Sequence, residues 1–305
     1  MTGVTRWTGR EAELLRQAMR KKGKEFADLV GVNPRQIPRW KRRGETIVLE
    51  LGNQAALDTL LAQATPAVQQ RFAALLTERA AAGHDERAEE LLRADARTRR
   101  HPVDGKVMTL VEEGIYLSGP DNRSVWLEAY LIDVYPTTNA DYARFVSDTD
   151  YGPPQHWPGG HYPVALVTHP VVWVTWHDAM AYAHWAGKAL PSAWQWEKAA
   201  RGPHGRAYPW GNEPTAAKAN VAGAGIGATT PVSRYQSGAS PYGVFDMCGN
   251  VWEWCSSEEE TGNGRYHLKG SAFTSPFTSA APSLQNTARA GMKDNDTGFR
   301  CVTAA

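Results

Sequence analysis

The chain has 305 residues, of which 42% are hydrophobic and 21% are charged, which fits a globular protein of about two domains. No run of eighteen apolar residues occurs, and the first thirty residues contain no apolar signal core, so we expect neither a membrane span nor secretion. Three cysteines are too few for a secreted disulfide framework, so we expect a cytoplasmic protein with reduced thiols. The net charge of +1 is unevenly divided, because residues 1–45 hold twelve Lys/Arg and five acids. A basic head on an acidic body predicts two domains with different partners.

Three short amphipathic helices are predicted in the basic head, residues 1–50. Their apolar faces consist of Leu14, Leu15 and Met19 in the first helix, Phe26, Leu29 and Val30 in the second, and Ile37 and Trp40 in the third. Gly31 is predicted to end the second helix. Asn33 is predicted to cap the third, with Pro34 as its first residue.

The stretch FADLVGVNPRQIPRW resembles the repressor-type helix-turn-helix of bacterial regulators. The resemblance implies that the third helix enters the major groove of duplex DNA. It assigns base contacts to Arg35 and Gln36, and phosphate contacts to Arg39, Lys41, Arg42 and Arg43. Pro38 departs from the pattern, because a proline inside a helix removes a hydrogen bond and favours a kink. A solvated basic helix in a protein-interaction module is the alternative.

Residues 51–101 are predicted to form a helical spacer that packs on the head or acts as a stiff connector. One helix begins at the cap Thr65 with Pro66 in its first position and carries apolar residues at helical spacing. A second, charged helix covers DERAEELLRADARTRRHP and ends before Pro102. This stretch shows no pattern of chemistry.

The body, residues 102–305, holds ten of the twelve tryptophans and many glycines and prolines. It predicts a compact α+β domain with long loops. Strands are predicted in KVMTLVEEGIYLSG, VWLEAYLIDVYPTT and PVVWVTW. Three helices are also predicted. One begins at the cap Asn139, one ends at Gly187, and one begins at the capping box of Ser192 and Gln195.

The residue pattern of the body predicts no catalytic centre, because no zinc-binding histidine pair, nucleophile elbow or phosphate loop occurs. His177 and His184 lie seven residues apart on one helix, about 10 Å, too far to share a metal ion. In DMCGNVWEWCSS, strand alternation places Trp252 and Trp254 on a core face, and Glu253 on the other face could meet Asp246. Two carboxylates with nearby carbonyls suit calcium, and a surface carboxylate pair is the alternative.

The body resembles the formylglycine-generating enzyme family, the sulfatase-modifying factors. The matching segments are YLIDVYPTTNADYARFV, HPVVWVTWHDAMAYAHWAGKALPSAWQWEKAARG, YPWGNE, TTPVSRYQSGASPYGVFDMCGNVWEWCSS, KGSAF and TGFRCV. The resemblance implies a C-type-lectin-like fold with little regular secondary structure. It also implies a structural calcium ion held by the side chains of Asp246 and Glu253 and the carbonyls of Gly249 and Val251. A second, weaker ion would use Asn220 and Val221, because the loop that completes its site is short here.

The resemblance breaks down at the catalytic cysteines. Family oxidases bind Cu(I) through two thiolates after the Gly-Ser of KGSAF, where this chain has Thr274 and Ser279. Related iron enzymes need a histidine-rich helical domain that residues 1–100 do not provide, so neither copper nor iron is expected. Cys255 and Cys301 are expected to be buried, reduced thiols.

We therefore favour a non-catalytic domain that binds an unknown protein or small molecule, coupled to a head that binds DNA. The segment 271–297 would line the site, with the ligand-binding residues Phe273, Thr274, Phe277, Ser279, Asn286 and Arg289. Two alternatives stay open: a divergent oxidase or nonheme-iron enzyme with an unassigned metal site, and a retroelement-diversified receptor.

Overall fold

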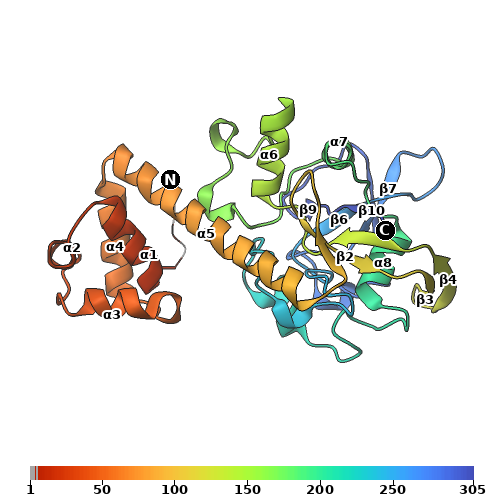
Figure 1. The fold of residues 1–305 in the computed structure, drawn as a ribbon, viewed down its shortest axis with the longest axis horizontal. Coiled ribbons are helices and arrows are strands. Elements are labelled where there is room, and N and C mark those ends of the chain that lie inside the picture. The colour runs from red at the N-terminus through yellow and green to blue at the C-terminus, as the bar shows by residue number, and fades with distance from the viewer. Residues whose placement is uncertain (1–3, 5) are drawn as a thin grey trace. The chain divides into compact units, whose positions relative to one another are not determined.

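The computed structural model describes residue 4 and residues 6–305, without the side chains at 80, 81 and 84. The chain divides into two compact units, one of residues up to 83 with the segment 163–167, the other of residues 84–162 and 168–305. Figure 1 shows the elements of both units. Within the described residues, no helix is long and apolar enough to cross a membrane.

The first unit is entirely helical. Its elements are α1 (Gly9–Ala18), α2 (Gly23–Val30), α3 (Gln36–Arg43), the 3-10 turn η1 (Gly44–Thr46), α4 (Leu51–Gln63) and the first part of α5 (Pro66–Ala94). Trp7 lies in its core and stacks on Phe72 of α5, with ring centroids 5.8 Å apart. Leu57 and Leu61 of α4 join the same core, so α4 and the start of α5 pack on the three predicted helices. The prediction that Leu29 faces this core was wrong, because its side chain is 47% exposed.

The third helix begins two residues later than predicted. The Asn33 carbonyl accepts from the Gln36 amide, and the Asn33 side chain accepts from the Arg35 amide, so residues 33–36 form a turn before α3. Pro38 is therefore the third residue of α3, in the first turn, where amides have no partner inside the helix. The expected loss of a hydrogen bond at Pro38 was wrong, and the proline is compatible with a regular helix.

The two helices predicted in the spacer are one helix, α5, which continues through Gly83, and a further helix, α4, precedes it. The first part of α5 packs in the first unit, and Ala88, Leu91 and Leu92 near its end pack in the second. The chain predicted as the end of a charged helix is instead a strand, β1 (Thr98–Arg100), paired with β2. The predicted domain limits at residues 50 and 101 stay a prediction.

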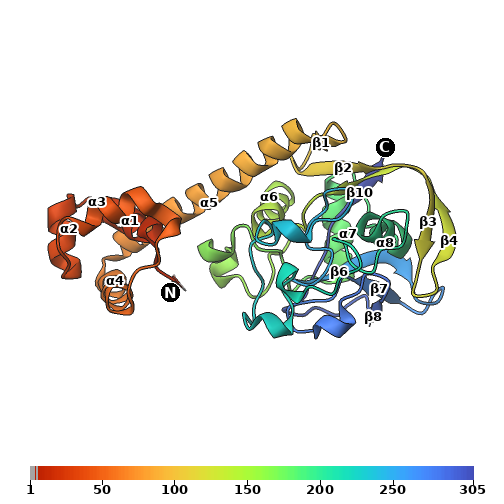
Figure 2. The ribbon, with the colours of Figure 1, turned by 90° about the horizontal axis from the view of Figure 1, so that it is seen from below.

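The second unit contains two four-stranded sheets and a hairpin (Figures 1 and 2). The antiparallel sheet has the order β1, β2 (Val107–Val111), β5 (Tyr130–Asp133), β10 (Val302–Ala304). The hairpin joins β3 (Gly114–Ser118) and β4 (Arg123–Leu127). The other sheet has the order β8 (Asn286–Arg289), β7 (Arg265–Lys269), β6 (Trp252–Glu258), β9 (Thr297–Gly298), and only β6 and β9 are parallel.

Three helices pack with these sheets: α6 (Asn139–Thr149), α7 (Trp176–Trp185) and α8 (Ala193–Arg201). Short 3-10 turns lie in the loops of the second unit: η2 (Pro158–Gly160), η4 (Ala216–Lys218), η5 (Ala222–Ala224), η6 (Gln236–Gly238) and η7 (Phe277–Ser279). A further turn, η3 (Val164–Leu166), belongs to the segment grouped with the first unit. The expected capping box of Ser192 and Gln195 starts α8. The cap of α6 is Thr138 rather than the predicted Asn139.

The predicted strand PVVWVTW does not form. Trp173 adopts a positive φ of 60°, and its amide donates to the Asp294 carbonyl rather than to a strand neighbour. The segment instead carries Val171 and Val174 into an aromatic core with Tyr142, Tyr182 and Trp254. Tertiary packing therefore overrides the local preference of these β-branched residues for a strand.

Buried ion pairs cross-link the second unit. The Lys188 ammonium lies 2.7 Å from an Asp104 oxygen and 2.8 Å from an Asp133 oxygen, and all three side chains are fully buried. Lys106 also reaches Asp133, at 3.0 Å. The two carboxylates raise the pKa of Lys188 against the opposing effect of burial, so the ammonium stays charged. These pairs hold β5 to the start of the loop after α7.

Candidate functional site

The predicted calcium segment leads into β6, where Glu253 is buried. One carboxylate oxygen accepts from Arg300 Nε at 2.7 Å and from Trp196 Nε1 at 2.8 Å, and the other accepts from Arg300 Nη2 at 2.7 Å. A guanidinium that binds both oxygens of a carboxylate neutralises its charge. Glu253 is thus not part of a surface carboxylate pair, and both of its oxygens already accept hydrogen bonds.

Asp246 lies one turn before β6 with a positive φ of 55°. One of its oxygens accepts from Asn250 Nδ2 at 2.9 Å. Burial raises the pKa of Asp246 to about 7, although the Asn250 hydrogen bond and the nearby Arg300 oppose the shift. A cation at this carboxylate would stabilise its ionised form.

The Asn220 side chain provides a further oxygen. Asn220 Nδ2 donates to the Ala228 carbonyl and to Asn250 Oδ1, but Asn220 Oδ1 is buried and accepts no hydrogen bond from the described residues. A buried acceptor without a donor is costly unless water or an ion satisfies it. The Asn220 oxygen is therefore an acceptor that the described residues leave unused, and the two calcium sites stay a prediction. Gly249 lies next to Asn220, because the backbone amide of the following residue, Asn250, donates to the Asn220 carbonyl at 2.8 Å.

The segment 271–297 divides between core and surface. Phe273 is buried, and its amide donates to the Asn250 carbonyl, so it supports the Asn250 network rather than a ligand surface. Thr274 is exposed, and its hydroxyl donates to the carboxylate of Asp296. Asp296 also accepts from the Thr297 hydroxyl at 3.1 Å, and its carbonyl accepts from the Trp252 amide. Sequence reasoning missed Asp296, since only the folded chain brings it to Thr274.

An aromatic wall lies beside this segment. The ring of Phe277 in η7 stacks on Tyr208 at 5.0 Å, and Tyr208 stacks on Trp210 at 5.3 Å. The Lys218 ammonium lies 5.8 Å from the Trp210 ring centre. Ser279 ends the same turn and is exposed. The half-buried wall offers π-faces and one cation to a ligand.

The other two predicted ligand-binding residues lie on a different element. Asn286 and Arg289 stand at the two ends of the edge strand β8, opposite Leu268 and Arg265 of β7. Within the described residues, no hydrogen bond or ion pair joins either of them to Thr274. The structure thus groups Thr274, Phe277 and Ser279 near one turn and leaves Asn286 and Arg289 along the sheet edge.

The three cysteines, Cys248, Cys255 and Cys301, are buried and unpaired. The Cys248 thiol donates to the Ala280 carbonyl at 3.2 Å, and burial raises its pKa to about 12. Burial also raises the pKa of Cys255 and Cys301. Within the described residues, no three His, Cys, Asp or Glu side chains converge on a point that could hold a metal ion. The chain thus presents no accessible thiolate pair for a soft metal.

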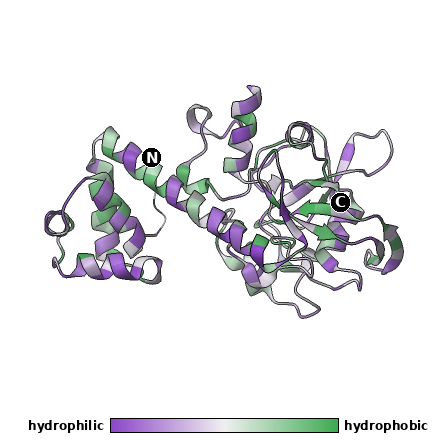
Figure 3. Cartoon of the chain, in the orientation of Figure 1, coloured by the Kyte–Doolittle hydropathy of each residue, from purple (hydrophilic) through white to green (hydrophobic). Residues whose placement is uncertain are grey.

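The predicted DNA-binding residues lie on α3 in the first unit or, for Arg35, just before it. Arg39, Lys41, Arg42 and Arg43 are exposed, as is Arg35 just before the helix, and Gln36 is half-buried. Ile37 and Trp40 face inward, as predicted. Lys41 lies 3.9 Å from Glu13, whereas the described residues place no carboxylate within 4 Å of the other four cations. Figure 3 shows α3 largely in the colour of hydrophilic residues.

The family model of the sulfatase-modifying factor enzyme 1-like domain matches residues 93–305. The chain belongs to this family. Its fold is the α+β fold expected from the resemblance: it superposes on PvdO from Pseudomonas aeruginosa with a TM-score of 0.59 and 21% identity, over 68% of this chain and 98% of PvdO. CarF superposes with a TM-score of 0.56 and 20% identity, over 67% of this chain and 100% of CarF. The head lies outside the matched residues.

Curated relatives of this sulfatase-modifying factor domain differ in their described activity. The chain is 31% identical to the uncharacterized protein YfmG of Bacillus subtilis, over 59% of this chain and 47% of YfmG. It is 33% identical to the formylglycine-generating enzyme of Thermomonospora curvata, over 44% of this chain and 61% of that enzyme. It is 29% identical to the inactive C-alpha-formylglycine-generating enzyme 2 of mouse, over 60% of this chain and 78% of the relative. The chain thus spans less than two thirds of the first two.

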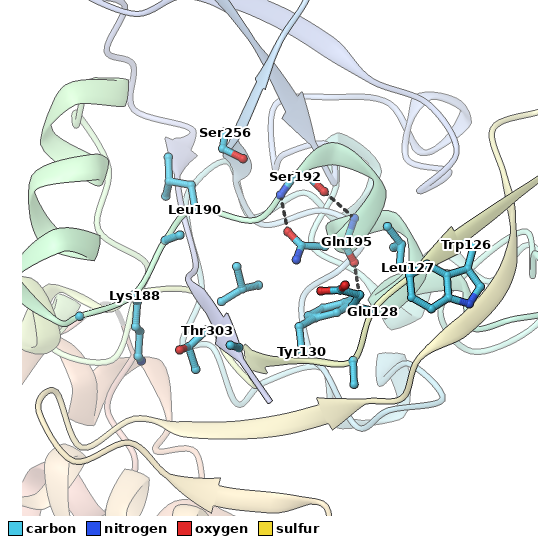
Figure 4. A pocket seen from close by; sticks show the side chains of 15 residues that line it. Trp126, Leu127, Glu128, Tyr130, Lys188, Leu190, Ser192, Gln195, Ser256 and Thr303 are labelled. Carbon is cyan, nitrogen blue, oxygen red and sulfur yellow. Dashed lines mark hydrogen bonds between the residues drawn. The ribbon is translucent and has the colours of Figure 1, made fainter.

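A pocket of about 780 Å³ lies elsewhere in the family domain, beside β10 (Figure 4). Trp126, Glu128, Gln195, Ser256 and Thr303 are among its lining residues, and none of the predicted ligand-binding residues is. Sequence reasoning missed it because its walls come from five separate segments. The one local signal was an alternation in β4 that leaves Trp126 56% exposed.

Proposed function

We propose that the family domain is a non-catalytic module that binds a ligand at Thr274, Phe277 and Ser279. One observation carries the proposal: the positions that resemblance assigns to the copper thiolates hold hydroxyls, and the Thr274 hydroxyl is bound to Asp296. A hydroxyl with a pKa far above neutrality cannot replace a thiolate for Cu(I). The surface nevertheless offers polar groups and the aromatic wall of Tyr208, Trp210 and Phe277, which suits recognition.

The cysteines elsewhere in the domain support this proposal. Cys248 and Cys301 are buried, and their raised pKa values keep them as thiols at neutral pH. The name of the mouse relative describes that protein as inactive. A domain of this family can thus persist without the oxidase reaction, and we extend that interpretation to this chain.

The experiment is mass spectrometry of a Cys-x-Pro-x-Arg peptide incubated with the purified chain, Cu(I), oxygen and a thiol reductant. We expect the peptide mass to stay unchanged, while a formylglycine-generating enzyme under the same conditions converts it to the aldehyde. Formation of the aldehyde by the wild-type chain would overturn the proposal.

We also propose a structural calcium ion beside Asn220 and Asp246. The support is the buried Asn220 oxygen without a donor and the buried carboxylate of Asp246. Calcium at one hundred times its dissociation constant would stabilise the fold by about 2.7 kcal/mol. The melting temperature in excess calcium should therefore be about 5–11 °C higher than the melting temperature in chelator for a domain of this size. Coincident melting curves, with no sensitised terbium luminescence on titration, would rule the ion out.

For the head, we propose duplex DNA as the partner. The support is the exposed cations of α3, together with the position of Pro38 in the first turn, where a proline does not interrupt the helix. Affinity should fall steeply with salt, because lysines and arginines displace condensed counterions.

The DNA test compares two double variants of the full chain. Arg39→Ala with Arg42→Ala should reduce the slope of log affinity against log salt by about 2, since each phosphate contact contributes about 0.9. Arg93→Ala with Arg99→Ala removes the same charge from exposed positions outside α3 and should leave the slope unchanged. Equal slopes for both variants, or no binding at low salt, would favour a protein-interaction module instead.

A further inference from the structure

The pocket beside β10 contains an unpaired edge of a sheet. Val302 exchanges two backbone hydrogen bonds with Ala189, at 2.8 and 2.9 Å. Backbone groups of residues two apart in a strand face the same way, so the amide and carbonyl of Ala304 face the same edge. The chain after Ala189 turns away to β6, where the Pro191 carbonyl accepts from the Ser256 amide at 2.8 Å. Within the described residues, no strand pairs with β10 along this edge beyond Val302.

The pocket has one uncompensated charge. Of its lining residues only Glu128 and Lys188 are ionisable at neutral pH. The Lys188 side chain is fully buried and its ammonium is paired with Asp104 and Asp133, so its charge is not presented to the pocket. The Glu128 side chain is exposed and has no ion-pair partner among the described residues. The site is therefore acidic despite the lysine in its wall.

Aromatic surface lies next to this carboxylate. Trp126 is 56% exposed, and its cross-strand partner Ile115 on the hairpin is 60% exposed. In Figure 4 the ring of Trp126 lies to one side of Glu128, and Thr303 of β10 lies to the other. A tryptophan face beside a carboxylate suits a lysine or arginine side chain, whose stem packs on the ring and whose charge meets the acid.

We propose that this pocket binds an extended peptide segment that carries a lysine or arginine. The peptide adds as a strand to the edge of β10 by pairing with the backbone of Ala304, and its basic side chain reaches Glu128 and Trp126. Neighbouring strands lie about 4.8 Å apart, so a strand added beyond β10 lies about 10 Å from the backbone that carries Glu128. A lysine and a glutamate side chain together span that distance. The site is separate from the surface at Thr274 and does not depend on the function proposed there.

The first test uses peptides of different chemistry on the full chain. A fluorescent peptide of alternating valine and lysine, six residues long, is titrated at low salt and followed by fluorescence polarisation. We expect it to bind, and we expect the matched valine–glutamate peptide not to bind. N-methylation of alternate amides should weaken binding about tenfold, because it removes the donors that pair with a strand edge. The single residue Nα-acetyl-lysine methylamide, which keeps the charged side chain, should bind far more weakly at equal concentration, because it has no neighbouring residues to form a strand.

The second test uses variants at exposed positions, where folding is not at risk. Glu128→Gln removes the charge, and Ala304→Pro removes the outward amide from an edge position that tolerates proline. Each should weaken the lysine peptide about tenfold, whereas the exposed control Glu213→Gln should not. Absence of binding, equal binding of the acidic peptide or of the N-methylated peptide, or full affinity in both variants would overturn the proposal.

Discussion

Replacement of Glu253 by glutamine tests whether Arg300 or a metal ion is the main partner of this carboxylate. In the structure, the two Glu253 oxygens accept two hydrogen bonds from Arg300 and one from Trp196, and all three side chains are fully buried. Glutamine retains the shape and one acceptor. The amide nitrogen of the glutamine, however, must face a donor. That donor is either Arg300 Nη2 or the two groups Arg300 Nε and Trp196 Nε1. The guanidinium loses its counter-charge and at least one charge-assisted hydrogen bond.

The cost follows from this loss. Removal of one partner of a buried ion pair destabilises a protein by about 3–5 kcal/mol, because the other charge stays buried. For a domain of about 200 residues, 1 kcal/mol corresponds to about 2–4 °C in melting temperature. We therefore expect Glu253→Gln to lower the melting temperature by about 6–20 °C in the presence of chelator, where no metal ion contributes.

Scanning calorimetry of four proteins provides the measurement: the wild type, Glu253→Gln, Arg300→Met and the double variant. The melting temperature of the double variant should fall by less than the sum of the two single decreases, because the double variant leaves no unpaired charge. Glu213→Gln, at an exposed position, controls for the change of net charge. A Glu253→Gln protein that melts with the wild type in chelator, but loses a stabilisation by calcium, would refute our assignment of Arg300 as the main partner.

Burial lowers the pKa of His169 from 6.5 to about 4, although its hydrogen bond to Thr229 opposes the shift. Between about pH 6.5 and 4 the unfolded chain therefore binds a proton at this histidine that the folded protein does not bind. Stability should accordingly fall from pH 6.5 to 4, and His169→Gln should reduce the difference between melting at pH 7 and pH 5; an equal difference in both proteins would contradict this. Thr274→Cys with Ser279→Cys should create Cu(I) binding that a competition assay with a chromogenic chelator detects, and failure of the double variant to compete would count against the assigned register. Pro38→Ala should change the free energy of unfolding by less than about 1 kcal/mol, because proline in the first turn costs little, whereas a gain near 3 kcal/mol in urea denaturation would place Pro38 in the helix interior.

Local patterns predicted the elements that depend on local chemistry. The capping box of Ser192 and Gln195 starts α8, and the stretches predicted as strands around Met108 and Leu131 form β2 and β5. The family motifs also predicted the fold of the body, residues 102–305, and the family model, which matches residues 93–305, and the structural neighbours confirm that fold. These features need only neighbouring residues or a long, ordered set of motifs.

Features that depend on distant partners escaped prediction. Glu253 and Arg300 are 47 residues apart, so nothing in the segment around Glu253 announced a guanidinium. The PVVWVTW segment has strong strand propensity, but the hydrogen bond from Trp173 to the Asp294 carbonyl draws it out of that conformation. The pocket beside β10 arises because the chain after Ala189 separates from β10 and runs to β6. The sequence of neither segment predicts where the two separate.

The burial of every cysteine makes this chain suitable for site-specific labelling. Cys248, Cys255 and Cys301 all have raised pKa values and are at most 4% exposed, so we expect a maleimide or disulfide reagent to react with them only slowly while the domain stays folded. Thiol modification of the native protein would therefore track global unfolding. A cysteine introduced at an exposed position, such as Trp126→Cys, would be the single reactive handle for a spin label or fluorophore, with no need to delete native residues.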